Sequence, residues 1–328
     1  MPERANVLDL TPSLRPLRNF WDRLRRGDEI AYVLTLIFAT AVIGITTVLV
    51  YQLWIQSALS RQKFGWAFFA TRVWDPVAGQ FGALPFLYGT LITSAIALLL
   101  AVPLGLGTAL FLSEFSFARI SDILAFLVDL LAAVPSVIYG LLGIFVLAPW
   151  LRIWAEPALG AHLRFVPLFS GPAYGVGFLG AGLILAIMVV PFIVSVSREV
   201  LISVPREQRE AALALGATRW EMISKAVVPF AKTGIIGSIF LALARALGET
   251  MAVTMVIGND PKISASLFAP GYSIAAVIAN EFTEATGSLY LSALIELGLV
   301  LFLVTFLLNG LARLLVLATA QHGSEIQQ

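Results

Sequence analysis

The stretch "VPREQREAALALGATRWEMISKAVVP" (residues 204–229) is too polar to cross a membrane and too periodic to be a loose loop. Pro205 suits the first turn of a helix, and Gly216 suits the position after a helix, where a left-handed backbone is needed. Thr218 and Glu221 have the spacing of a capping box, which starts a second helix. The stretch therefore predicts two short helices that meet at a glycine corner.

The chain around this stretch has the composition of a polytopic membrane protein. Its 328 residues are 59% hydrophobic and 12% charged, whereas a soluble domain carries about 25% charged residues. The absence of cysteine excludes thiol catalysis, disulfides and cysteine metal sites. His162 and His322 lie far apart in sequence and do not suggest a metal site, so we expect none.

We predict an all-α fold with six membrane-spanning helices, since each span needs about 20 apolar residues. Residues 1–29 precede the transmembrane domain, which occupies residues 30–318, and residues 319–328 form a tail. The six predicted spans are residues 30–55, 84–112, 123–147, 178–196, 233–257 and 289–316.

The distribution of lysine and arginine predicts the orientation. With the N-terminus inside, the inner segments carry 14 of these residues and the outer segments carry 6. Loops that carry the excess of positive charge stay in the cytoplasm. We therefore expect both termini, and residues 204–229, on the cytoplasmic side.

The fifth predicted span contains "ALARALGETMAV" (residues 242–253), with Arg245 and Glu249 one helical turn apart. A charge at mid-membrane costs about 2.5–3.5 kcal/mol on the insertion scale, so both side chains should face the protein interior or a water-filled path. The two can pair along the helix. An arginine on the path would offer planar, bidentate donors to an oxyanion. A neighbouring carboxylate could accept the proton that phosphate carries and sulfate lacks.

Two further acids, Asp129 and Glu296, fall within predicted spans and are candidates for the same path. For both, the alternative is a polar contact between helices that has no part in transport. That alternative also stays open for Arg245 and Glu249.

The polar stretch resembles the EAA loop of ABC-importer permeases. The matching residues are Glu210, Ala211 and Ala212, with Gly216 four positions later and Pro229 further along. The resemblance implies a type I importer permease whose loop couples it to an ATPase subunit. The "AKTG" segment (residues 231–234) lacks the glycines of a phosphate-binding loop, so we expect ATP and Mg to be bound by partner chains, and no cofactor or enzymatic activity in this one.

Other motifs are similar to the phosphate-importer (Pst) family, and to its PstC-like members in particular. They are residues 242–259, "WDP" (residues 74–76), residues 81–105 and "AAVPSVIYG" (residues 132–140). The resemblance implies a bacterial inner-membrane permease that carries inorganic phosphate by alternating access. Its implied partners are a PstA-like second permease, two PstB-like ATPase subunits and a PstS-like periplasmic phosphate-binding protein.

Three alternatives remain at this stage. The first is the same class of permease with another oxyanion, such as molybdate or sulfate. The second is an ion-gradient-driven transporter or channel whose intramembrane acids relay protons. The third is a membrane scaffold or sensor that binds the ATPase without transporting anything.

Overall fold

The computed structural model describes residues 28–163 and 165–324. The chain divides into two compact units, residues 1–52 and residues 53–328, and each is described by itself. Most of the predicted N-terminal segment (1–29) and the end of the predicted tail (319–328) lie outside the described residues. The described part of the first unit is one apolar helix, most of α2.

Helices account for most of the described residues. In chain order they are α2 (Asp28–Gln56), α3 (Ala58–Phe64), α4 (Ala67–Ala70), α5 (Leu84–Leu110), α6 (Ala118–Ala132), α7 (Ser136–Leu142), α8 (Ala148–Trp150), α9 (Glu156–His162), α10 (Phe178–Ile202), α11 (Arg206–Ala214), α12 (Arg219–Met222), α13 (Val228–Leu247), α14 (Met251–Val256), α15 (Ile274–Glu281) and α16 (Ser288–Ser324).

Six helical segments of the described chain are long and apolar enough to cross a membrane, which confirms the predicted all-α, six-span class. Short π-helical turns join α7, α8 and α9 into one of these segments, and another joins α12 to α13. The six segments are Ala31–Gln56, Leu84–Phe115, Ser136–His162, Phe178–Ile202, Arg219–Leu247 and Ser288–Leu314.

Helix α10 is the centre of the second unit and packs against α5 and α13. A Cβ atom placed on Gly182 would lie 2.5 Å from Cγ2 of Ile96, so only glycine permits this approach of α10 to α5. Close approach through small residues is the usual way in which helices associate in membranes. The buried hydroxyls of Ser197 and Ser238 share a hydrogen bond of 2.8 Å between α10 and α13.

The third span begins later than predicted. Residues 123–147 are not one helix, because α6 ends at Ala132 and Pro135 has an extended backbone (ψ 138°) before α7. Proline has no N–H to donate, and the residue before it avoids helical geometry. The apolar segment that is long enough to span is Ser136–His162, and α6 is a separate helix. Pro103 behaves differently, since α5 continues through it.

The fifth span is also shifted toward the N-terminus. Predicted residues 233–257 are interrupted after Leu247, and α14 begins only at Met251. Upstream, the helix that starts at Arg219 continues through a π turn into α13 without a break at Pro229. Arg245 is therefore in the last turn of α13 and Glu249 is in the break, so the two are not on one continuous helix.

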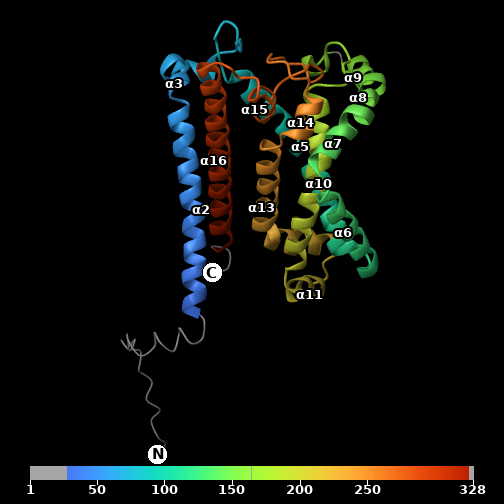
Figure 1. Cartoon of the computed structure of the whole chain (residues 1–328). Coiled ribbons are helices and arrows are strands. Elements are labelled where there is room, and N and C mark those ends of the chain that lie inside the picture. Colours follow the sequence, from blue (N-terminus) through green and yellow to red (C-terminus); the bar gives the residue numbers. More distant parts are fainter. Residues whose placement is uncertain (1–27, 164, 325–328) are drawn as a thin grey trace, which may run out of the picture. The chain divides into compact units, whose positions relative to one another are not determined.

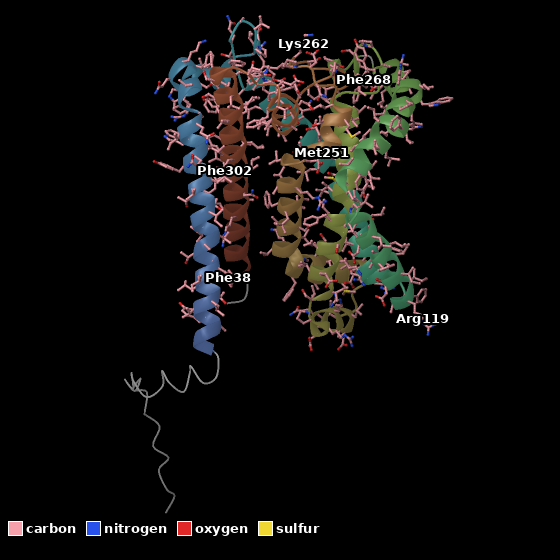
Figure 2. The ribbon with its side chains drawn as sticks, in the orientation of Figure 1. Phe38, Arg119, Met251, Lys262, Phe268 and Phe302 are labelled. Carbon is pink, nitrogen blue, oxygen red and sulfur yellow. The ribbon has the colours of Figure 1, made fainter. Side chains whose placement is uncertain are left out.

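Within the second unit, α11 lies at one end of the helices, and α9 and α15 lie at the opposite end (Figure 1). Figure 2 shows Arg119 toward the α11 end and Lys262 and Phe268 at the α15 end. We refer to these as the α11 end and the α15 end.

Candidate functional site

The predicted glycine corner is present at the α11 end. Helix α11 stops at Ala214, and Gly216 follows with φ of +85°, a left-handed conformation that glycine adopts without strain. The Thr218 hydroxyl accepts a hydrogen bond from the Glu221 amide (3.3 Å), and the Glu221 carboxylate accepts one from the Thr218 amide (3.0 Å). The predicted capping box is thus confirmed. We call residues 206–222 the hairpin.

Large apolar side chains are exposed at the corner of the hairpin. Leu215 is 90% exposed and Trp220 is 62% exposed in this chain. Glu210 and Ala211 are exposed as well, and Ala212 is half-buried against an apolar cluster to which α5, α10 and α13 contribute. A shallow groove of about 400 Å³ runs over the corner, lined by Ala212, Leu215, Gly216, Ala217, Glu221, Lys225 and Ala226.

A buried ion pair ties the hairpin to the transmembrane helices. Glu114 lies in the last turn after α5, with its side chain only 5% exposed. Arg209 of α11 donates to Oε1 of Glu114 from Nη2 (2.8 Å) and to Oε2 from Nε (3.3 Å). The same guanidinium donates to the Leu201 carbonyl (2.8 Å) at the end of α10, where a cation is favoured by the helix dipole.

A second arginine reaches the same turn, since Nη2 of Arg219 donates to the Glu114 carbonyl (2.6 Å). The two arginines therefore join the hairpin to the end of α5 through Glu114, and Arg209 also joins it to the end of α10. Glu114 was not predicted as a site residue. Its only signal is an acid at the end of an apolar run, and nothing in the linear sequence pairs it with an arginine 95 positions later.

Arg245 and Glu249 have different surroundings. Arg245 is exposed in this chain, and its guanidinium carbon lies 5.8 Å from the ring centroid of Phe192 on α10. The Glu249 carboxylate instead accepts a hydrogen bond from the Ala252 amide (3.1 Å), which caps the start of α14. Among the described residues no ion pair joins the two.

Asp129 and Glu296 have separate environments. Asp129 Oδ1 accepts a hydrogen bond from Ser195 (2.9 Å), which is a contact between α6 and α10. Glu296 of α16 is 2% exposed and lines a pocket with Arg61. No hydrogen bond or ion pair within residues 28–163 and 165–324 connects either acid to Arg245.

The α15 end contains a polar network that was likewise not predicted from the sequence. Glu281 Oε2 accepts hydrogen bonds from Trp74 Nε1 (2.8 Å) and from the Tyr290 hydroxyl (2.7 Å). This carboxylate, at the end of α15, joins the segment before α5 to the first turn of α16. Nearby, burial raises the pKa of Tyr272 to about 12, although the Asn280 amide hydrogen-bonds to its hydroxyl (3.1 Å) and opposes the rise.

Comparison with known proteins identifies a family and several full-length relatives. Residues 101–320 match the model of the binding-protein-dependent transport system inner membrane component family. The chain is 44% identical over 316 residues to the phosphate transport system permease protein PstC of Mesorhizobium japonicum, covering 95% of this chain and 97% of the relative. It is 45% identical over 312 residues to the protein of the same name from Xylella fastidiosa, covering 94% of each.

One solved structure supports the fold. A bacterial ABC transporter involved in the import of the acidic polysaccharide alginate aligns with a TM-score of 0.58 over 90% of this chain and 99% of that chain, at 17% identity. At this identity the similarity concerns the arrangement of helices. In this chain, that arrangement of helices positions the exposed hairpin, the ion pair that anchors it and the charged residues near the break after α13.

Proposed function

The chain belongs to the family of binding-protein-dependent transport system inner membrane components, and on that premise we propose that it carries inorganic phosphate as a permease subunit of an ABC importer. The observation that carries the proposal is the similarity to two phosphate permeases, at 44% and 45% identity over almost the whole length of both chains. The six apolar helices make it a multi-pass membrane protein.

We infer an orientation in which the α11 end faces the cytoplasm of a bacterial cell and the membrane is the inner one. The excess of lysine and arginine in the segments assigned to that side supports it. Both termini are then cytoplasmic, and the α15 end faces the periplasm, where a phosphate-binding protein would release phosphate to the permease.

The hairpin is the proposed contact with the ATPase. Exposed apolar side chains beside a groove are typical of interaction sites. Leu215 lines the groove next to Gly216, and Trp220 is exposed on α12. Glu210 and Ala211 present the EAA residues on an open face of α11. ATP and Mg would be bound by two such ATPase subunits, and the ion pair between Glu114 and Arg209 would pass their motion to α5 and α10.

Arg245 is the proposed contact with phosphate. Its exposure in the isolated chain supports a position on a path that is completed by a second, PstA-like permease subunit. A guanidinium offers paired donors that match two oxygens of an oxyanion. Glu249 lies in the break between α13 and α14, close to Arg245 in sequence, and would accept the proton of hydrogen phosphate only after leaving the Ala252 amide.

The proposal is tested by uptake of labelled phosphate in cells that lack this chain and carry it again on a plasmid. We expect uptake only in the complemented cells, with competition by arsenate and none by sulfate or molybdate. Competition by sulfate or molybdate would reassign the cargo. Uptake that survives loss of the ATPase and collapses with an uncoupler would instead support an ion-gradient-driven transporter.

A further inference from the structure

A pocket of about 330 Å³ lies beside α16, on the side of α3 and α4. Its residues belong to the second unit and come from the last turn of α2, the α3–α4 region and α16. Most of the lining is aromatic or aliphatic, with one acid and one arginine. The lining residues are Trp54, Arg61, Gly65, Trp66, Phe69, Glu296, Leu299, Val300 and Leu303.

The acid in this pocket, Glu296, has a carboxylate oxygen without a hydrogen-bond donor in the described chain. Glu296 is 2% exposed, and its Oε2 has no hydrogen-bond partner among the described residues. One turn earlier on α16, Ser292 is fully engaged: it accepts from the Ser60 amide (3.1 Å) and donates to the Gln56 carbonyl (2.9 Å). A buried carboxylate oxygen without a partner is unfavourable, so Oε2 of Glu296 is poised for a donor that the described residues do not supply.

The arginine in the pocket is held in place with donors to spare. The Arg61 guanidinium stacks on Trp54, with its carbon 3.6 Å from the ring centroid. Its Nε donates to the Ser57 hydroxyl (3.0 Å) and its Nη2 to the Trp54 carbonyl. A guanidinium has five N–H groups, and Nη1 makes no hydrogen bond within the described chain. These groups are available to an anion.

The rest of the pocket continues along the membrane-spanning part of α16. Leu299, Val300 and Leu303 follow Glu296 at helical spacing, and Leu303 is 45% exposed. Trp54 and Trp66 are both more than half exposed, and tryptophan is enriched where a membrane meets water. The pocket thus combines an arginine, a carboxylate and an apolar wall along α16.

We propose that this pocket binds one phospholipid with a primary-amine headgroup. Its phosphate contacts Arg61, its ammonium group donates to Glu296, and one acyl chain lies along Leu299 and Leu303. The two opposite charges favour a zwitterionic lipid over an anionic one. The requirement of Glu296 for N–H donors favours a primary amine over a trimethylated one. In this arrangement Glu296 is occupied by lipid and does not face transported phosphate.

The test uses the assembled transporter, purified in detergent and stripped of lipid. Native mass spectrometry then measures the binding of phosphatidylethanolamine, phosphatidylcholine and phosphatidylglycerol with identical acyl chains. We expect the wild-type complex to prefer phosphatidylethanolamine by about tenfold or more, the equivalent of one hydrogen bond to a charged group. Equal retention of the three lipids, or of none, would overturn the proposal.

Variants separate the parts of the site. Glu296→Gln should abolish the preference for phosphatidylethanolamine, whereas Glu284→Gln, an exposed acid at the α15 end, should leave it unchanged. Leu303→Trp fills the apolar part without altering charge, and we expect it to lower the retention of all three lipids. An unchanged preference in Glu296→Gln would contradict the proposal, and the melting temperature of each variant shows whether the complex is folded.

A photo-crosslinking residue at position 299 distinguishes a lipid from a protein occupant. We expect cross-links to phosphatidylethanolamine in membranes. A cross-link to the second permease subunit instead would mean that a partner side chain fills the pocket, and the lipid proposal would be wrong. Neither outcome depends on the transported substrate, so a failure here leaves the proposed function untouched.

Discussion

Arg209 of the hairpin grips the carboxylate of Glu114 through two hydrogen bonds, although 95 positions separate the two residues. The pair joins α11 to the end of α5, and the same arginine also donates to the Leu201 carbonyl in α10 and to the Val204 carbonyl just after it. One side chain thus connects the proposed ATPase contact to two helices of the transmembrane core. The hairpin is thus attached to the transmembrane helices at a defined ion pair.

Removal of one partner of this pair should weaken the attachment of the hairpin to the transmembrane helices. Breaking a buried ion pair costs about 3–5 kcal/mol, because the remaining charge stays buried and unpaired. We expect Arg209→Ala to lower the melting temperature of the purified complex and to lower the phosphate uptake obtained per ATP hydrolysed. The matched control is Glu199→Gln, whose side chain is 72% exposed and pairs with Arg198, and which should change stability by less than about 1 kcal/mol. Equal melting temperatures for wild type and Arg209→Ala would refute the attachment.

The left-handed backbone at Gly216 should be required for the shape of the corner. No atom lies within 4 Å of a Cβ placed there, so Gly216→Val acts through its backbone. A left-handed conformation costs about 1–2 kcal/mol in a residue other than glycine. We expect ATP hydrolysis in this variant to continue while transport fails.

The control for this variant is Gly237→Ala in α13, where there is also open space but the backbone is helical. Alanine there should be neutral or stabilise the helix by about 0.5–1 kcal/mol. Coupled turnover at the wild-type level in Gly216→Val, measured as phosphate transported per ATP, would show that the corner does not transmit motion.

Arg245 should be essential for uptake and dispensable for assembly. Arg245→Gln removes the paired donors of the guanidinium, and we expect transport to be lost while the complex is recovered in normal yield. Arg245→Lys keeps the charge without the planar donors, so it should retain a small fraction of the activity. Lys232→Gln, an exposed cation earlier in α13, serves as the control. Wild-type uptake in Arg245→Gln would rule out a direct contact with phosphate.

The buried phenol of Tyr272 should make the protein sensitive to alkali. Because burial raises its pKa from 10.0 to about 12, the folded state favours the neutral form. The contribution of the neutral phenol to the free energy of unfolding is complete below the unfolded-state pKa of about 10. It is lost as the pH rises through about 12. Thermal unfolding across this range should show the wild type losing stability relative to Tyr272→Phe. Parallel pH profiles of the two proteins would contradict the assignment.

Local signals in the sequence predicted the hairpin well. Gly216 and the Thr218–Glu221 capping box act over three or four residues, and the structure confirms both. Hydropathy likewise predicted six apolar spans, because each span is a separate run of about 20 apolar residues. Hydropathy does not detect a break in the helix within an apolar run. The observed third and fifth spans therefore differ from the predicted ones, because the backbone is extended at Pro135 and the helix is interrupted after Leu247.

The contacts of the site were less predictable, because they join distant parts of the chain. Arg245 and Glu249 were expected to be able to pair because they are four residues apart, and the break between them instead lets Glu249 cap α14. Glu114 and Glu281 gained their partners only when α5, α10, α15 and α16 came together. Nothing in residue spacing identifies such partners, and the roles of Asp129, Glu296 and Arg245 in transport stay predictions.

Reconstitution tests the central claim most directly. The purified complex of this chain, the second permease subunit and the ATPase subunits is placed in proteoliposomes with the phosphate-binding protein on the side of the α15 end. Labelled phosphate should cross toward the α11 end only when ATP and Mg are supplied on that side, and arsenate but not sulfate should compete. Phosphate movement that proceeds without ATP, or that sulfate and molybdate abolish equally, would contradict the account.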